Sequence, residues 1–224
     1  MKRRASSAPN EIASAVRDLV GLFLQKHADL TPPAFLNRIE ILARNLATWG
    51  VRMNLTARPE DPEEIAFHII DSLMPIVLAT EVDALRSVFH PDSEVLDLGS
   101  GAGFPGLVLA SGCDAHFTLV ESRRKRASFL QIATAEMELR NVAIETRRAE
   151  EIDLVSRFDV VTARAFGDPS VFFALAASAL KPAGLAMLYA NPSQHFNVEV
   201  ERIPYDLERD GRRVDRVLAI RPQR

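Results

Sequence analysis

The segment Val95–Gly106, which reads VLDLGSGAGFPG, constrains this chain more than any other part of its sequence. A short apolar run containing one acid, Asp97, leads into glycine at every second position and then into a segment able to begin a helix. A backbone without side chains lets a ligand lie directly on main-chain N–H groups, and a helix N-terminus favours electron-rich groups. The segment therefore predicts a strand, a ligand-binding turn and a helix.

Two classes of ligand fit this turn. The spacing Gly-x-Gly-x-x-Gly over residues 101–106, with Glu121 about 20 residues further on, matches the dinucleotide fingerprint. Residues 97–103 also match the acidic-Gly-x-Gly-x-Gly pattern of S-adenosylmethionine-dependent methyltransferases. The dinucleotide interpretation leaves Asp97 and Gly99 unexplained, and a carboxylate would repel a phosphate. We therefore favour S-adenosylmethionine as the ligand.

Length and composition indicate an ordinary globular protein. The 224 residues are 47% hydrophobic and 25% charged, which suits one large domain or one domain with an extension. The single Cys113 allows no internal disulfide, as in a reducing cytosol. The basic start Met1–Ser7 is followed by no apolar core, and the longest apolar stretch, Val171–Leu180, is too short to span a bilayer. We expect a cytoplasmic monomer with no membrane partner.

Charge is distributed unevenly along the chain. The net charge is −3, yet residues 122–148 hold seven Lys and Arg against three Glu, and residues 209–224 hold six Arg against two Asp. A local basic face can bind RNA even when the whole chain is acidic. A solvated helix face explains the clustering equally well.

The first ninety residues predict a helical region. Apolar residues recur at helical spacing over 10–30, and Thr31 followed by proline is typical of a second helix start, with Gly50 as its end. Asp61 followed by proline begins a third helix, which Pro75 is expected to kink or end.

From residue 94 onwards the pattern alternates between strands and helices. This alternation predicts an α/β fold with a doubly wound, mostly parallel sheet and an antiparallel edge hairpin. We expect residues 1–90 to form a helical extension packed on the same domain and 91–224 to form the methyltransferase core. The expected strands are 94–98, 116–121, 141–146, 158–162, 185–190, 196–203 and 214–221; the expected helices are 104–111, 124–139 and 169–180; and 181–184 is an expected turn.

In such a sheet the ligand lies at the carboxyl ends of the strands. Asp97 and the glycine turn follow the first strand, and Glu121 closes the second, where a carboxylate can accept both ribose hydroxyls. The segment 148–151 follows the third strand, where an adenine edge could be recognised. Arg164 closes the fourth among small apolar residues and needs an anionic partner: a ligand carboxylate, an RNA phosphate or a protein acid.

No hydrolase-type catalytic constellation is present. Ser100 does not lie in the Gly-x-Ser-x-Gly nucleophile elbow, and the five histidines lack metal-ligand spacing, so we assign no catalytic residue and no metal. His68 and Asp71 are one helical turn apart and could form a local pair, which suits a surface or interface contact better than acid–base catalysis. Methyl transfer to a nitrogen with a free lone pair needs only in-line positioning.

Several motifs together resemble one family. In their order and residues they are similar to the ribosomal RNA small subunit methyltransferase G family, also called glucose-inhibited division protein B, over about residues 35–190. The motifs are Asn54-Leu-Thr-Ala, His68-Ile-Ile-Asp-Ser, Asp97 to Gly106, Phe117 to Ser122, Lys125-Arg126 with Phe129-Leu130, Ala149-Glu-Glu, Phe158-Asp-Val-Val and Arg164-Ala-Phe.

The resemblance implies a Rossmann-like methyltransferase fold with an N-terminal helical extension. It also implies S-adenosylmethionine as methyl donor and guanine N7 of small-subunit (16S) ribosomal RNA, naked or in its particle, as acceptor. It implies cofactor contacts by Gly99, Phe104, Ala149, Glu150 and Arg164, to which the residue pattern adds Asp97, Gly101, Gly103 and Glu121. The candidate substrate contacts are Asn54, His68, Arg123, Arg124, Lys125 and Arg164.

Two departures from the family pattern concern the substrate half. Phe67 stands where the family usually has Arg, and Tyr189-Ala-Asn191 stands where it commonly has Lys-Gly. Both changes remove cations from places where RNA phosphate could be met. The alternatives are a divergent paralogue that methylates a small molecule or protein, a non-enzymatic cofactor- or RNA-binding module, and, as an outsider, a dehydrogenase.

Overall fold

A computed structural model describes residues 9–27, 29–86, 88–151 and 155–223, so that the basic start Met1–Ser7 lies outside the described residues. The helices are α1 (Pro9–Leu24), α2 (Phe35–Met53), α3 (Pro62–Leu78), α4 (Gly106–Gly112), α5 (Arg124–Glu136) and α6 (Pro169–Ala179), with the 3-10 turns η1 (Asp83–Leu85) and η2 (Ala149–Glu151). The strands are β1 (Glu94–Leu98), β2 (His116–Val120), β3 (Val142–Glu145), β4 (Phe158–Arg164), β5 (Leu180–Ala190), β6 (Glu201–Arg209) and β7 (Arg212–Pro222).

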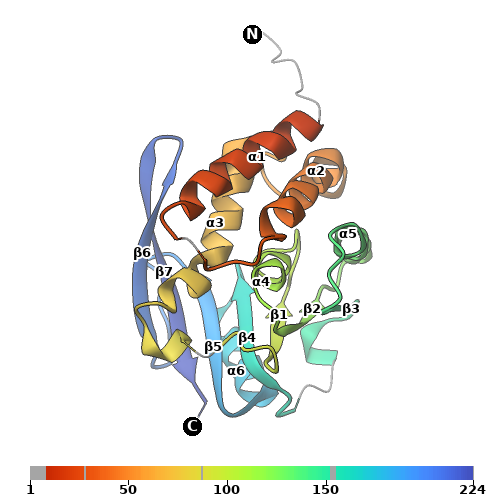
Figure 1. Cartoon of the computed structure of the whole chain (residues 1–224). Helices are drawn as coiled ribbons and strands as arrows, with labels where there is room; N and C mark the ends of the chain where they lie inside the picture. Colours follow the sequence, from red (N-terminus) through yellow and green to blue (C-terminus); the bar gives the residue numbers. More distant parts are fainter. Residues whose placement is uncertain (1–8, 28, 87, 152–154, 224) are drawn as a thin grey trace.

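The seven strands form one sheet in the order β3-β2-β1-β4-β5-β7-β6. Strands β1 to β5 are parallel, and β7 runs antiparallel to both β5 and β6. The predicted Rossmann-like class with a mostly parallel sheet and a terminal hairpin is confirmed. The second hairpin strand, β7, lies beside β5, and β6 forms the edge (Figure 1).

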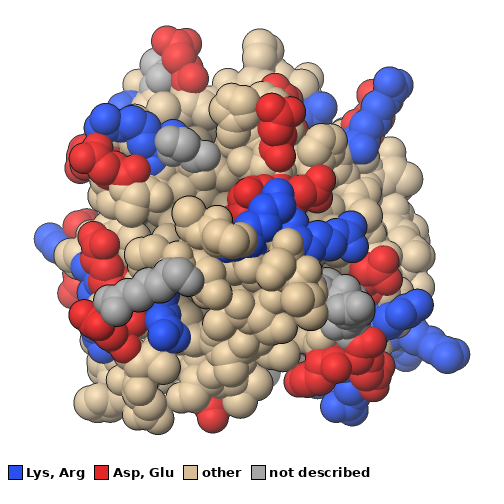
Figure 2. Space-filling view, turned by 90° about the horizontal axis from the view of Figure 1, so that it is seen from below, with Lys and Arg blue, Asp and Glu red and all other residues tan. Residues whose placement is uncertain are grey.

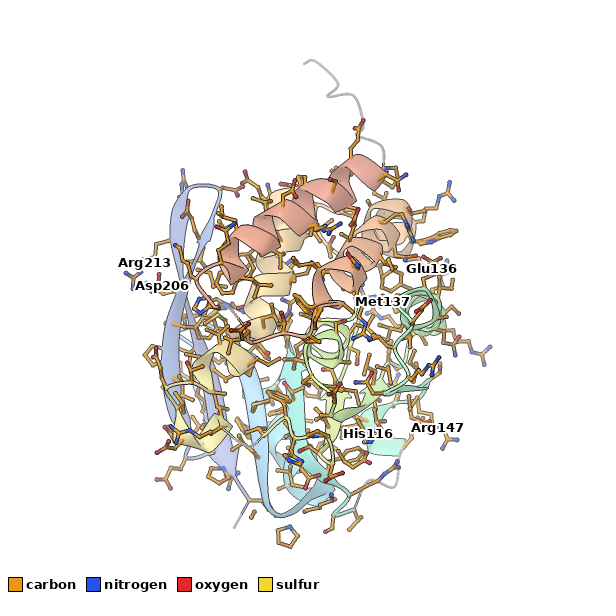
Figure 3. The ribbon with its side chains drawn as sticks, in the orientation of Figure 1. His116, Glu136, Met137, Arg147, Asp206 and Arg213 are labelled. Atoms are coloured by element: carbon orange, nitrogen blue, oxygen red, sulfur yellow. The ribbon has the colours of Figure 1, made fainter. Side chains whose placement is uncertain are left out.

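Helices cover both faces of the sheet, because alternate strand residues point to opposite sides. Val95 joins a buried cluster with the helices α1 to α5, whereas Leu96 and Leu98 join a second cluster under α6. The three N-terminal helices thus share one apolar core with α4 and α5. Figure 3 shows Glu136 of α5 at the side of α2, where its Oε2 accepts a hydrogen bond of 2.9 Å from Asn45 Nδ2.

The β6–β7 hairpin stands beside the N-terminal helices. Figure 1 shows its turn rising next to α1 and α3. On the hairpin, Figure 3 labels Asp206 and Arg213 close together, with 3.2 Å between Arg213 Nη2 and Asp206 Oδ1. The predicted Asp210-Gly211 turn is confirmed, and both residues have the positive φ angles (51° and 68°) that a tight hairpin turn requires.

The N-terminal helix ends required correction. Asp61 caps α3 as predicted, accepting from the Glu63 N–H at 3.0 Å, but the helix continues through Pro75 to Leu78. Helix α1 ends at Leu24 rather than near residue 30, because the polar residues Gln25, Lys26 and His27 follow Leu24.

The second helix begins at Phe35 rather than after Thr31 and runs past Gly50 to Met53, where Asn54 caps it with a φ of 52°. Gly50 is needed for another reason: an added Cβ there would overlap the side chain of Pro59.

Two strands also differ from expectation. The predicted turn at 181–184 lies inside β5, where the pairing with β4 shifts register after Phe158 and Ala183 has a φ of 64°. The expected strand at 196–203 lies instead at 201–209, since alternate side chains of that segment, including Ile203 and Leu207, are buried. Bulges and edge strands leave weak local signals, because they depend on pairing with distant residues.

Candidate functional site

The glycine turn lies at the carboxyl end of β1. Gly99, Gly101 and Gly103 have φ values of 75°, 55° and 87°, a region that other residues rarely adopt. The N–H groups of Gly99 and Ser100 donate to the Val120 carbonyl at 2.9 and 3.1 Å, which folds the turn over the end of β2. A Cβ added at Gly99 would meet no atom within 4 Å, so one side of the turn is open.

Asp97 lies beneath this turn and is fully buried. Its Oδ2 accepts a hydrogen bond of 3.1 Å from the Gly106 N–H, at the start of α4. Desolvation raises the pKa of Asp97 to about 7. Its Oδ1 has no hydrogen-bond partner within the described part of the chain. Asp97 therefore connects β1 to the start of α4 by a hydrogen bond and keeps one buried oxygen available to a donor.

Glu121 sits beside the turn and is also buried. Its Oε1 accepts from the Arg123 N–H at 2.8 Å, and its Oε2 accepts from the Gly101 N–H at 3.1 Å. Two main-chain amides thus hold the carboxylate against the glycine turn, as its place at the end of β2 suggested. Ala149 and Glu150 form η2 after β3, the neighbour of β2 in the sheet, and Glu150 is exposed.

Arg164, at the end of β4, lies on the other side of the turn. Its Cζ is 4.7 Å from the centre of the Phe104 ring, a cation–π contact. Its Nη1 is 3.4 Å from Asp71 Oδ2 and 3.3 Å from His68 Nδ1. Of the three anionic partners that the sequence allowed, the structure shows a protein acid, Asp71.

His68 is held as a neutral imidazole. Desolvation, reinforced by the positive charge of Arg164, lowers its pKa to about 3. Its Nε2 lies 3.2 Å from Glu64 Oε1, so the hydrogen-bond network assigns the proton to Nε2 and leaves Nδ1 to accept from Arg164. The described residues show no hydrogen bond between His68 and Asp71, and each side chain binds other partners instead.

Asp71 is bound by the hairpin instead. Its Oδ1 accepts from Tyr205 Oη at 2.8 Å and from Arg216 Nε at 3.1 Å, and its Oδ2 accepts from Arg216 Nη2 at 3.0 Å. Arg209 adds an ion pair with Glu64, and its guanidinium lies 5.3 Å from the centre of the Phe67 ring. Sequence reasoning did not place these residues in the site, and its one signal was the run of arginines after residue 209.

These residues surround a pocket of about 310 Å³ at the ends of β4 and β5. This volume lies at the lower end of the range for ligand pockets. Its lining includes Phe67, His68, Asp71, Arg164, Phe166, Tyr189, Asn191, Arg209 and Arg216.

The other candidate substrate contacts lie around the start of α5. Arg123, Arg124 and Lys125 are exposed there, and Arg126 Nη2 donates to the Asn54 carbonyl at 2.7 Å. Cations at a helix N-terminus oppose the helix dipole, so this cluster does not serve helix stability. The structure brings Asn54 to α5 and places His68 with Arg164.

Beyond these sites, charges of both signs are interspersed with uncharged surface on the face shown in Figure 2. Across the described ranges, no group of three or more His, Cys, Asp or Glu could hold a metal ion. No helix that the structure describes is long and apolar enough to cross a membrane.

Comparison with known proteins matches residues 36–215 to the family described as rRNA small subunit methyltransferase G. Several relatives carry the name ribosomal RNA small subunit methyltransferase G. The one from Sorangium cellulosum is 39% identical over 153 residues, which are 66% of this chain and 61% of that protein. The one from Burkholderia multivorans is 32% identical over 82% of this chain and 76% of its own length. The one from Borreliella burgdorferi is 30% identical over 75% and 77%.

Solved structures of lower identity share the fold. A Pyrococcus horikoshii TYW2 structure in complex with MeSAdo has a TM-score of 0.50 and 16% identity, covering 62% of this chain and 61% of that chain. Another Pyrococcus horikoshii chain has a TM-score of 0.53 at 16% identity, covering 69% and 64%.

Proposed function

The chain belongs to the rRNA small subunit methyltransferase G family, and from this premise we propose that it transfers a methyl group from S-adenosylmethionine to guanine N7 of small-subunit ribosomal RNA. The observation that carries the proposal is the glycine turn, which is open beside Gly99 and has the unpartnered Oδ1 of Asp97 beneath it.

The residues around the turn fit this cofactor. The main chain of Gly99, Gly101 and Gly103 offers a surface without side chains, and the two oxygens of Glu121, each already bound by a main-chain amide, would accept from ribose hydroxyls. Ala149 and Glu150, after the next strand, would meet the base, and Phe104 and Arg164 would border the methyl-donor end. When bound, the cofactor supplies a sulfonium methyl group that is already activated toward nucleophiles.

The geometry favours positioning over proton transfer. Both ring nitrogens of His68 are engaged, by Glu64 and Arg164, and its low pKa keeps it from accepting a proton near neutral pH. A guanine ring nitrogen has a free lone pair and needs no general base, so a site that only holds the base in line is sufficient.

The basic cluster beside the turn supports an RNA substrate. Arg123, Arg124 and Lys125 are exposed next to Glu121 and would contact phosphates of the ribosomal RNA or its particle. A ribosomal substrate places the activity in the cytoplasm, and we propose that the protein acts there as a monomer, which light scattering would test.

A Gly99→Ala variant tests the cofactor site. A Cβ at this position would occupy the open side of the turn, and we expect binding of S-adenosylhomocysteine, measured by calorimetry, to be lost. Gly211→Ala is a matched control, because Gly211 also has a positive φ (68°) and open space but lies in the hairpin turn. Both variants should lose about 1–2 kcal/mol of stability from left-handed strain. Equal cofactor affinity in the two variants would contradict this site.

The acceptor is tested with methyl-labelled cofactor and unmethylated small subunits, followed by mapping of the label. Label at a guanine N7 of the ribosomal RNA is expected, and no label in this RNA would refute the proposal.

The second candidate, a paralogue acting on a small molecule or protein, rests on Phe67 and Asn191, which replace expected cations. Label found only in those fractions of a cell extract would favour it. Calorimetric binding of a nicotinamide dinucleotide without binding of S-adenosylhomocysteine would favour a dehydrogenase.

A further inference from the structure

The pocket at the ends of β4 and β5 has a wall of guanidinium groups that comes from two parts of the chain. Arg164 belongs to β4, whereas Arg209 and Arg216 belong to the hairpin. We define these three residues as the arginine wall. Their side chains are 13%, 31% and 15% exposed, and all three line the pocket.

The acids that hold the wall lie beneath it. The side chains of Asp71 and Glu64 are 1% and 3% exposed; Asp71 binds Arg164 and Arg216, and Glu64 binds Arg209. Asp71 also lines the pocket, but its carboxylate is already paired with Arg164 and Arg216, so the more exposed groups are the guanidinium N–H donors. In Arg164 every hydrogen bond uses Nη1, which leaves Nε and Nη2 without a partner among the described residues.

The wall is also rigid before any ligand arrives. Two nitrogens of Arg216 bind Asp71, and its Nη1 donates to Asn191 Oδ1 at 2.9 Å. Tyr205 and Tyr189 brace the same region: Tyr205 donates to Asp71, and Tyr189 Oη donates to the Ser72 carbonyl at 2.8 Å. Donors fixed in place lose little conformational freedom on binding an anion.

Aromatic rings stand beside these cations. Phe166 and Tyr189 line the pocket, and the Phe67 ring lies under the Arg209 guanidinium. Guanidinium groups suit phosphate, and flat rings suit a nucleobase, so the combination is complementary to one nucleotide of a single strand. Phe67 occupies a position where an arginine was expected, and Arg209 returns a positive charge to the same place from the hairpin.

We propose that the arginine wall binds the phosphate of the target nucleotide, extruded from its strand, and that the hairpin residue Arg209 makes this contact at the pocket mouth. The inference rests on the proposed function, since it assigns the RNA-binding side of that site. Arg209 is the most exposed member of the wall, and Arg216, held by Asp71, supports it.

Arg209→Gln is the informative variant because the buried Glu64 keeps other hydrogen-bond partners, so we expect the variant to fold. Glu64 would keep Arg58 Nη2 at 3.0 Å and His68 Nε2 at 3.2 Å as partners. Arg213→Gln is the matched control: it removes one arginine from the same hairpin, but Arg213 is 72% exposed and pairs with Asp206 and Asp215 outside the pocket. Arg209→Lys retains the charge.

The experiment uses the full chain with S-adenosylhomocysteine and small-subunit rRNA transcribed in vitro, with Kd measured from about 50 to 200 mM KCl, the range over which phosphate contacts change affinity most visibly. For Arg209→Gln we expect a several-fold rise in Kd and a decrease of about 0.7 in the slope of log K against log salt, the value for one contact to a single strand. The control should keep the wild-type slope, Arg209→Lys should restore most of it, and S-adenosylhomocysteine affinity should be unchanged in all variants.

The outcomes separate this inference from the proposed function. If the wild type methylates rRNA and Arg209→Gln keeps both the wild-type slope and the wild-type KM for rRNA, the inference is overturned while the function stands. If the wild type binds rRNA or the unmethylated small subunit but methylates neither, the function fails, and the slope of Arg209→Gln on the bound substrate still decides the phosphate contact. If the wild type binds neither of them, both are overturned. An equal loss of slope in Arg213→Gln would also overturn the inference, because it would indicate general charge rather than a wall contact.

Discussion

Acidification should destabilise the protein through His68. The folded state holds this imidazole neutral, with a pKa lowered from 6.5 to about 3, whereas the unfolded chain protonates it near 6.5. The unfolded state therefore binds one more proton in the window between these values, and stability falls as the pH decreases through it. If the shift is taken at its full size, the free energy of unfolding falls by about 2 kcal/mol between pH 7 and pH 5. Since the side chain is 21% exposed, we expect roughly 1–2 kcal/mol after screening by solvent.

Urea unfolding at pH 7, 6 and 5 would measure this contribution as a difference between wild type and His68→Gln. Asp97 acts with the opposite sign, because burial raises its pKa to about 7 and the folded state binds the extra proton. That effect is present in both proteins and cancels in the difference. The wild type should lose about 1–2 kcal/mol more than the variant on going from pH 7 to pH 5. His195→Gln, at an exposed loop residue, is the control and should follow the wild type. Parallel losses in wild type and His68→Gln would refute the reasoning.

Two further predictions concern Asp97 and Gly106, which lie beneath the glycine turn proposed to bind the cofactor. The buried Asp97 carboxyl of the wild type must ionise as the pH rises through about 7, which lowers the free energy of unfolding, whereas Asp97→Asn carries no such group. The stability of the variant relative to wild type should therefore rise by about 1.4 kcal/mol between pH 6 and pH 8.5. A pH-independent difference in urea unfolding would contradict the raised pKa. Gly106→Ala places a Cβ 2.5 Å from Asp97 Oδ2 and should cost about 2–3 kcal/mol through crowding and loss of the hydrogen bond at the start of α4. Thermal unfolding with Gly211→Ala as the reference would show this, and equal melting temperatures would count against the packing argument.

Local signals predicted the elements that depend on neighbours in sequence. The Asp61 cap of α3 and the Asp210-Gly211 turn were both recognisable, because a cap and a tight turn are decided within a few residues. The end of α2 was not, since the need for glycine at position 50 comes from Pro59 packing across it. The interior of β5 was likewise missed, because its bulge exists only in pairing with β4.

The sequence by itself determined the strand, turn and helix around Asp97–Gly106, the place of Glu121 and the alternating sheet, because chain geometry and residue spacing dictate each of these locally. The tertiary structure alone decided the pocket that we propose for the substrate. Asp71 and Arg216 are 145 residues apart and meet only because β7 pairs with β5 and carries the hairpin against α3. No sequence spacing encodes that contact: the partner of a buried charge is chosen by the strand order of the sheet, and here the order placed the hairpin's arginines where the pocket opens.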